Sequence, residues 1–176
     1  MKQAIALLEW LVEAFGGLAR LCVLALVFLV ATNVILRYLF SIGPVALQEL
    51  EWHLISPIAL LGLAYTMKHK ADVRVDFIYD RFGPRGRALV DLVAAILTLA
   101  VGIIITKLAL PYVMQSFRIM EGSPNPGGLP YRYLLKAFIP LGFALLALQA
   151  IANILHAITQ LFPARFQSSG ELEHDR

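Results

Sequence analysis

Charged side chains are scarce in this sequence, and their scarcity excludes most soluble folds. Asp, Glu, Lys and Arg make up 15% of the 176 residues, whereas 59% are hydrophobic, and the mean hydropathy is +0.73. A soluble globule covers itself with polar groups, and too few are available here. We therefore expect an integral membrane protein that has lipid as its main solvent.

Cysteine is nearly absent as well. The single one, Cys22, lies within an apolar run, so no disulfide can form within the chain, and we interpret it as a small buried hydrophobe. The sequence also lacks a convergent set of nucleophile, base and orienting group. It predicts neither an enzyme nor a cofactor or metal site.

Four apolar runs are long enough to cross a bilayer, which takes about 20 helical residues. The sequence thus predicts an all-α, four-helix membrane domain over residues 1–162, followed by a polar segment, 163–176, that is typical of a disordered tail. The four helices are expected at about 18–38, 47–67, 88–110 and 134–156.

The distribution of basic residues predicts the orientation. The net charge of +3 and the pI near 9.2 do not indicate a nucleic-acid partner, because the basic residues lie in short segments between the apolar runs. Positive residues are retained on the cytoplasmic side. The connection between the second and third helices is therefore cytoplasmic, and four crossings place both termini there too. That connection holds Lys68, Lys70, Arg74, Arg81, Arg85 and Arg87.

The segment before the first membrane helix is amphipathic. Lys2, Glu9 and Glu13 recur at helical spacing, with apolar residues on the other side. One interpretation is a helix that lies in the membrane interface and bends at the Gly16-Gly17 pair before the chain enters the bilayer. The other is a plain extension of the first membrane helix.

The second helix begins with unusually polar residues. Glu49 and His53 are one turn apart, so the carboxylate could orient the imidazole. Because polar groups are costly in lipid, three interpretations remain open. They are a cap at headgroup level, a contact with a partner subunit, and a proton or metal site that lacks a third ligand. The candidate interface residues are Glu49, Glu51, Trp52 and His53.

Two connecting segments have a distinct composition. Residues 73–78 alternate apolar and charged side chains, which favours a short strand or the start of an amphipathic helix. Residues 121–130 are dense in proline and glycine, which predicts a constrained loop. Such a loop could dock a partner or simply connect two helices.

The chain resembles the small membrane subunit of tripartite ATP-independent periplasmic (TRAP) transporters, the DctQ-like family. The resemblance lies in residues 61–65, Leu-Gly-Leu-Ala-Tyr, followed by Lys68-His69 and by Val-Arg-Val-Asp at 73–76. Residues 121–143 are similar to the branch for mannitol, chloroaromatic compounds or 2-oxo acids. In place of the Gly-His pair of many members, this chain has Ala71-Asp72. The family-motif residues are Gly62, Lys68, Arg74, Asp76, Gly122, Pro126, Gly127, Lys136 and Pro140.

The resemblance implies a three-part system in the bacterial inner membrane. Its parts are a soluble periplasmic binding protein, a large membrane subunit that moves a small organic acid with sodium, and a small subunit that acts as a scaffold for the large one. Two rivals remain at this point. One is a membrane anchor subunit of a respiratory complex with a haem or quinone site, and the other is a small transporter that works alone as an oligomer.

The centres of the four expected helices carry little polarity. They fall near Phe28, Pro57, Leu99 and Leu145, and the hydroxyls nearby belong to Ser56 and Thr98. Transporters place polar or unwound segments at the membrane midplane. We therefore expect no substrate or ion pathway within this chain. The charges in the expected helices lie within a few turns of a helix end: Glu49, Glu51, Asp91, Lys107 and Lys136.

Overall fold

The computed structural model of the protein describes residues 2–71, 79 and 81–161, and they are overwhelmingly helical. This confirms the all-α class. The segment 73–78, with Arg74 and Asp76, and the expected tail 163–176 lie outside the described residues. The helices are α1 (Lys2–Phe40), α2 (Val45–Lys68), α4 (Pro84–Arg118) and α5 (Arg132–Leu161).

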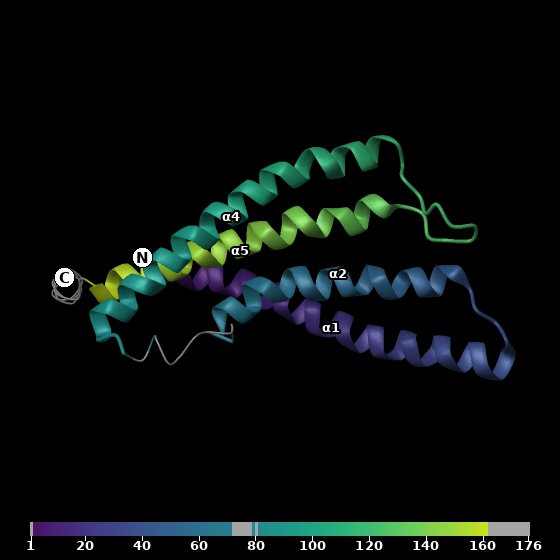
Figure 1. Cartoon of the computed structure of the whole chain (residues 1–176), viewed down its shortest axis with the longest axis horizontal. Helices are drawn as coiled ribbons and strands as arrows, with labels where there is room; N and C mark the ends of the chain where they lie inside the picture. The colour runs from purple at the N-terminus through teal and green to yellow at the C-terminus, as the bar shows by residue number, and fades with distance from the viewer. Residues whose placement is uncertain (1, 72–78, 80, 162–176) are drawn as a thin grey trace.

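The helices form two hairpins (Figure 1). One consists of α1 and α2, and the other of α4 and α5. The start of α1 and the end of α5 lie at one end of the bundle, which we name the terminal end, and the α1–α2 and α4–α5 connections lie at the opposite end, which we name the loop end. Helix α5 packs against α4, α2 and α1, whereas α4 packs mainly against α5. Helix α5 therefore joins the two hairpins, and α4 lies at the edge.

Three of the helices are long and apolar enough to cross a membrane by length and composition alone, namely Ile5–Phe40, Pro84–Arg118 and Arg132–Leu161. Helix α2, expected to span as residues 47–67, is not among them, since its first turns carry Glu49 and Glu51. It nevertheless lies alongside α1 and α5 within the bundle. The chain is thus an all-α integral membrane protein with one helix more polar than the rest.

Small side chains hold α4 against α5. The buried residues of α4 recur every seventh position, which gives a continuous seam that drifts slowly around the helix. In the middle of the seam, a Cβ added to Gly102 would lie 3.0 Å from both the Cβ of Ala147 and the carbonyl oxygen of Phe143. Such close approach of backbones is what stabilises helix pairs in lipid. The seam consists of Ala88, Ala95, Gly102, Ala109 and Ser116.

The N-terminal segment continues α1 without a break, so the structure matches an extended first helix rather than a separate interfacial one. Gly16 explains the difference. It is buried against the ring of Tyr65 on α2, and a Cβ at this position would overlap that ring. The glycine allows two helices to approach closely, and α1 continues through it as one helix. Nearby, Val12 is only 1% exposed and belongs to the core with Leu61 and Leu145.

Candidate functional site

The connection between α4 and α5, residues 119–131, is a structured loop at the loop end, and we name it the Pro/Gly loop. The Gly128 N–H donates to the carbonyl of Asn125 at 3.0 Å. Between them, Pro126 and Gly127 occupy the central positions of a turn, and Gly127 has a φ of +76°. Proline followed by a residue with positive φ is the signature of a type II turn. The expectation of a constrained loop therefore agrees with the structure.

Glu49 on α2 fixes this loop from the neighbouring hairpin. Its carboxylate accepts hydrogen bonds from the Ser123 hydroxyl, from Asn125 Nδ2 at 2.9 Å and from the Leu129 N–H at 2.8 Å. The side chain of Glu49 is nearly buried, with 6% exposed. A buried carboxylate needs several donors, and here the loop supplies all three. Glu49 is thus a bridge between the two hairpins.

A second carboxylate holds the base of the Pro/Gly loop. Glu121 accepts hydrogen bonds from Lys136 Nζ at 2.5 Å and from the Ser116 hydroxyl at 2.6 Å. These two donors, Lys136 first, hold the pKa of the Glu121 carboxyl below its usual value. The Lys136 ammonium also lies 4.2 Å from the ring centroid of Tyr112 on α4. The start of α5 is therefore tied to the end of α4.

The other candidate residues at the start of α2 have different surroundings. Glu51 accepts a hydrogen bond from Asn33 Nδ2 of α1 at 2.8 Å. His53 does not contact the Glu49 carboxylate. Its Nδ1 lies 2.7 Å from the backbone carbonyl of Glu49, which can only accept, so this nitrogen carries the proton. Trp52 is 59% exposed. Of the four candidate interface residues, Trp52 is the one that faces away from the bundle.

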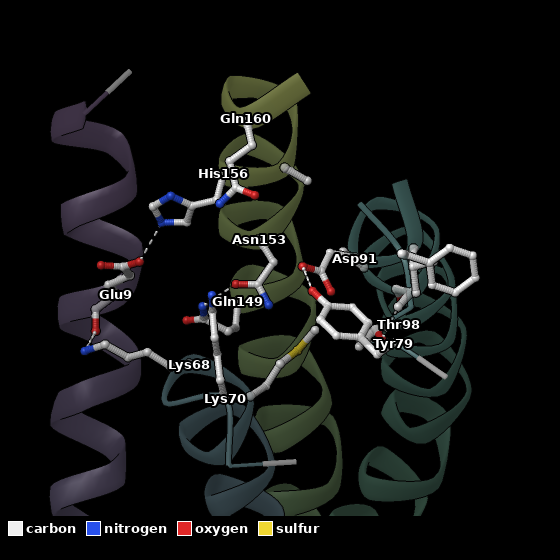
Figure 2. A pocket seen from close by; sticks show the side chains of 16 residues that line it. Glu9, Lys68, Lys70, Tyr79, Asp91, Thr98, Gln149, Asn153, His156 and Gln160 are labelled. Atoms are coloured by element: carbon white, nitrogen blue, oxygen red, sulfur yellow. Dashed lines mark hydrogen bonds and ion pairs between the residues drawn. The ribbon is translucent and has the colours of Figure 1, made fainter. Parts of the chain in front are cut away.

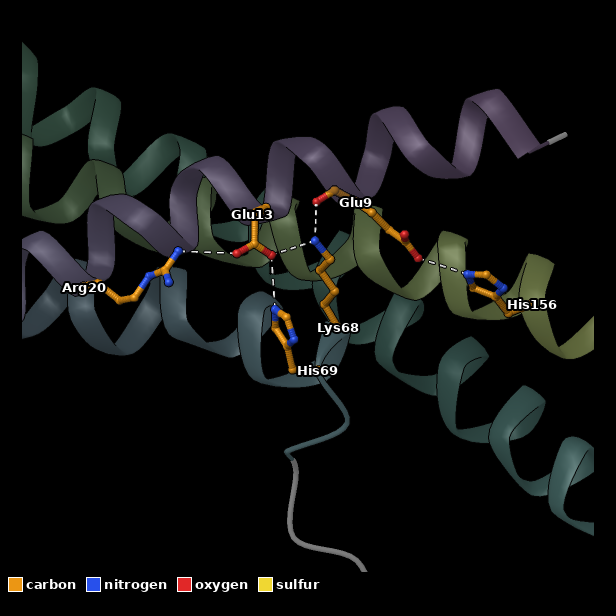
Figure 3. Close-up of polar contacts among 6 residues, drawn as sticks. All are labelled: Glu9, Glu13, Arg20, Lys68, His69 and His156. Atoms are coloured by element: carbon orange, nitrogen blue, oxygen red, sulfur yellow. Dashed lines mark hydrogen bonds and ion pairs between the residues drawn. The ribbon is translucent and has the colours of Figure 1, made fainter.

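A further polar cluster occupies the terminal end (Figure 3). Glu13 of α1 forms ion pairs with Lys68 at 2.7 Å and with Arg20 at 3.3 Å, and its carboxylate lies 3.1 Å from His69 Nε2. The N-terminal carboxylates were expected on the polar side of an amphipathic segment, and the distant lysine was not foreseen as their partner.

Glu9 extends this cluster to α5. Its carboxylate lies 3.0 Å from His156 Nε2, and its backbone carbonyl accepts a hydrogen bond from Lys68 Nζ at 3.0 Å. Charged groups at one end of the bundle thus connect α1 to both α2 and α5. The family-motif position Lys68 acts here as a link between helices.

A cavity of about 600 Å³ opens beside this cluster, between the terminal ends of the helices (Figure 2). Its lining includes Glu9, Gln149 and Asn153. Gln149 is 1% exposed and donates to Asn153 Oδ1 at 3.0 Å, and its own Oε1 has no partner in the described part of the chain. From the sequence, only charges and hydroxyls near the membrane midplane were considered as polar groups. The amides of Gln149 and Asn153 were therefore not identified as candidates. The described residues contain no group of three side chains that could hold a metal ion.

The remaining family-motif residues fall into three environments. Gly62 lies on α2, and a Cβ there would meet nothing within 4 Å. Pro140 is buried within α5. The other three belong to the Pro/Gly loop and are Gly122, Pro126 and Gly127.

Comparison with known families places the chain in a family of transporter components. The family described as "Tripartite ATP-independent periplasmic transporters, DctQ component" matches residues 10–160, which include α2 and α4 in full, α5 up to residue 160 and α1 from residue 10 onward. A comparison with curated proteins found no match.

Proposed function

Because this chain belongs to the DctQ family of tripartite ATP-independent periplasmic transporter components, we propose that it is the scaffold subunit of a sodium-driven, binding-protein-dependent transporter for small organic acids. Its partners are the large membrane subunit and a periplasmic binding protein. The respiratory anchor is not favoured, since the family is one of transporter components.

The main support for the scaffold proposal comes from the contacts that polar side chains make between helices. Several carboxylates bind groups on other helices or on the loop, namely Glu49 with the Pro/Gly loop, Glu51 with Asn33 and Glu13 with Lys68. Transporters instead leave such groups facing a route for substrate or ions. Groups that join helices make a rigid body, and rigidity is what a scaffold supplies.

The orientation is part of the same proposal. The terminal end carries the basic connection between α2 and α4, including Lys68 and Lys70, so we place it in the cytoplasm. The Pro/Gly loop then lies on the periplasmic side, where the binding protein works. The hydrogen bonds from Glu49 support a fixed shape for this loop, which suits a surface in contact with other components.

Reconstitution in liposomes tests the proposal. The purified chain alone should take up no organic acid under a sodium gradient, whereas the chain with its large subunit and binding protein should do so. Glu49→Ala and Trp52→Ala should each lower recovery of the complex. Gln48→Ala, on the same turn of α2, should not.

Two results would contradict the scaffold assignment. One is sodium-driven uptake by the lone chain. The other is a Glu49→Ala complex that assembles fully and yet has lost its coupling to sodium, because the carboxylate would then act in transport rather than in structure.

A further inference from the structure

The cavity at the terminal end lies where α2 stops short of α5. A Cβ added to Gly142 of α5 would contact Leu60 of α2, and the two helices run in the same direction (Figure 1). Because each residue adds the same rise in both helices, Lys68, the last residue of α2, is about level with Ala150. Helix α5 continues to Leu161, and the cavity of about 600 Å³ lies beside this last part of it.

Gln149 on the wall of this cavity needs a hydrogen-bond donor. It is 1% exposed, and its side chain is among those that line the cavity (Figure 2). Its Nε2 donates to Asn153 Oδ1, whereas its Oε1 has no partner within the described part of the chain. A buried amide oxygen without a partner bears the full cost of lost hydration. A molecule in the cavity that brings an N–H or O–H would remove that cost.

The cavity carries charges of both signs. Its lining includes the carboxylates of Glu9 and Asp91 and the ammonium groups of Lys68 and Lys70. Lys68 uses two of its three donors on the Glu13 carboxylate and the Glu9 carbonyl. Lys70 is exposed, and its side chain makes no hydrogen bond or ion pair with any residue that the structure describes. A ligand that itself carries a cation and an anion suits this lining better than an ion of one sign.

The wall opposite the charged groups is apolar. It is formed by Val90, Ala94 and Ala95 of α4, which belong to a helix apolar enough to cross a membrane. The cavity therefore joins the polar end of α2 to the apolar side of α4. A soluble ion would use the polar wall alone, whereas a phospholipid would place its headgroup on one wall and the start of its chains on the other. The volume lies within the range of about 300–1,000 Å³ that is typical of ligand sites.

We propose that this cavity binds the headgroup of one phospholipid that carries a primary ammonium, namely the phosphoethanolamine group. The ammonium donates to Gln149 Oε1, the phosphate accepts from Lys70, and the chains leave along Val90 and Ala94 of α4. The site belongs to the lipid leaflet at the terminal end. It is independent of the transport function proposed above, because it needs neither a large subunit nor a substrate.

Native mass spectrometry of the full chain tests the site. The protein is freed of lipid in mild detergent and titrated with lipids that have identical acyl chains. Phosphatidylethanolamine should bind about tenfold more tightly than phosphatidylcholine, whose trimethylated nitrogen keeps the charge but has no N–H, and than phosphatidylglycerol, which has no ammonium. Lys70→Gln should weaken the binding of phosphatidylethanolamine and phosphatidylcholine alike, because both present a phosphate.

Gln149→Met is the decisive variant, since methionine is similar in size and lacks the amide oxygen. It should lower the affinity for phosphatidylethanolamine about tenfold and abolish the preference over phosphatidylcholine. The matched control is Gln115→Met on the exposed surface of α4 near the loop end, which should bind like the wild type. In lipid-free detergent, Gln149→Met should unfold at the same midpoint as the wild type or a higher one, because it removes an unpaired buried oxygen.

Four results would overturn the proposal. The first is equal binding of phosphatidylethanolamine and phosphatidylcholine by the wild type, and the second is unchanged binding of phosphatidylethanolamine by Gln149→Met. The third is a lower unfolding midpoint of Gln149→Met without lipid, since the amide would then have a structural role. The fourth is binding of water-soluble glycerophosphoethanolamine as tight as that of the lipid, because the wall on α4 would then contribute nothing.

Discussion

At Gly142 the helices α2 and α5 of the two hairpins approach closely, and substituting this glycine tests how the hairpins are joined. A Cβ added to Gly142 on α5 would lie 2.7 Å from both the Cβ and the carbonyl oxygen of Leu60 on α2. Non-bonded carbon atoms prefer about 3.5–4.0 Å, so in Gly142→Ala the helices have to separate by about 1 Å. Part of this contact is with the backbone carbonyl of Leu60, and a backbone group cannot rotate away as a side chain can.

The expected loss follows from this overlap. Inserting a methyl group into a packed contact costs typically about 1–3 kcal/mol. The matched control is Gly62→Ala, where the new Cβ meets nothing within 4 Å. Because alanine is the better helix former by about 1 kcal/mol, Gly62→Ala should be as stable as the wild type or slightly more stable. The two alanine variants should then differ by roughly 1–3 kcal/mol in free energy of unfolding.

Unfolding of the purified protein by titration with a denaturing detergent, followed by circular dichroism, measures this difference. Both variants add the same methyl group to a helical glycine, so changes in the unfolded chain largely cancel. If Gly142→Ala unfolded at the same midpoint as Gly62→Ala, the α2–α5 contact at this position would not hold the hairpins together.

Two further predictions concern the loop end. The lowered pKa of Glu121 means that its ionised form stabilises the fold above the ordinary value of 4.5, and that this contribution is lost as the pH falls through the lower folded pKa. The unfolding midpoint should therefore drop between about pH 6 and about pH 3 in the wild type, and less so in Glu121→Gln. Reporter fusions should read cytoplasmic near Gly83 and periplasmic near Pro126, and the reverse pattern would reject the orientation.

The helices could be predicted from the sequence because long apolar runs determine them almost alone. Their ends could not. Helix α4 continues to Arg118, well beyond the expected limit near residue 110, because hydropathy marks only the apolar part of a helix. The Gly16-Gly17 pair was open to two interpretations, since a glycine allows either a bend or a close contact, and only the position of Tyr65 decides between them.

The candidate site was predictable in part for a similar reason. The cost of a carboxylate in lipid indicated that Glu49 needs a partner, and the composition of residues 121–130 indicated a constrained loop. That the two belong together was beyond the sequence, because Ser123 and Leu129 are distant in the chain. The buried amides Asn33 and Gln149 gave no signal, as a single uncharged residue barely changes the hydropathy of a run.

The bridge from Glu49 to the Pro/Gly loop has a consequence for biosynthesis. Helix α2 leaves the ribosome long before Ser123, Asn125 and Leu129 exist, and α5, which joins the hairpins, comes last. During insertion the Glu49 carboxylate therefore has no protein donors and remains hydrated or within the insertion machinery. The carboxylate can be captured only after the Pro/Gly loop has been made. A chain that stops after α4 lacks Ser123, Asn125 and Leu129, so its Glu49 carboxylate would remain without these donors and would distinguish it from a chain that contains the loop.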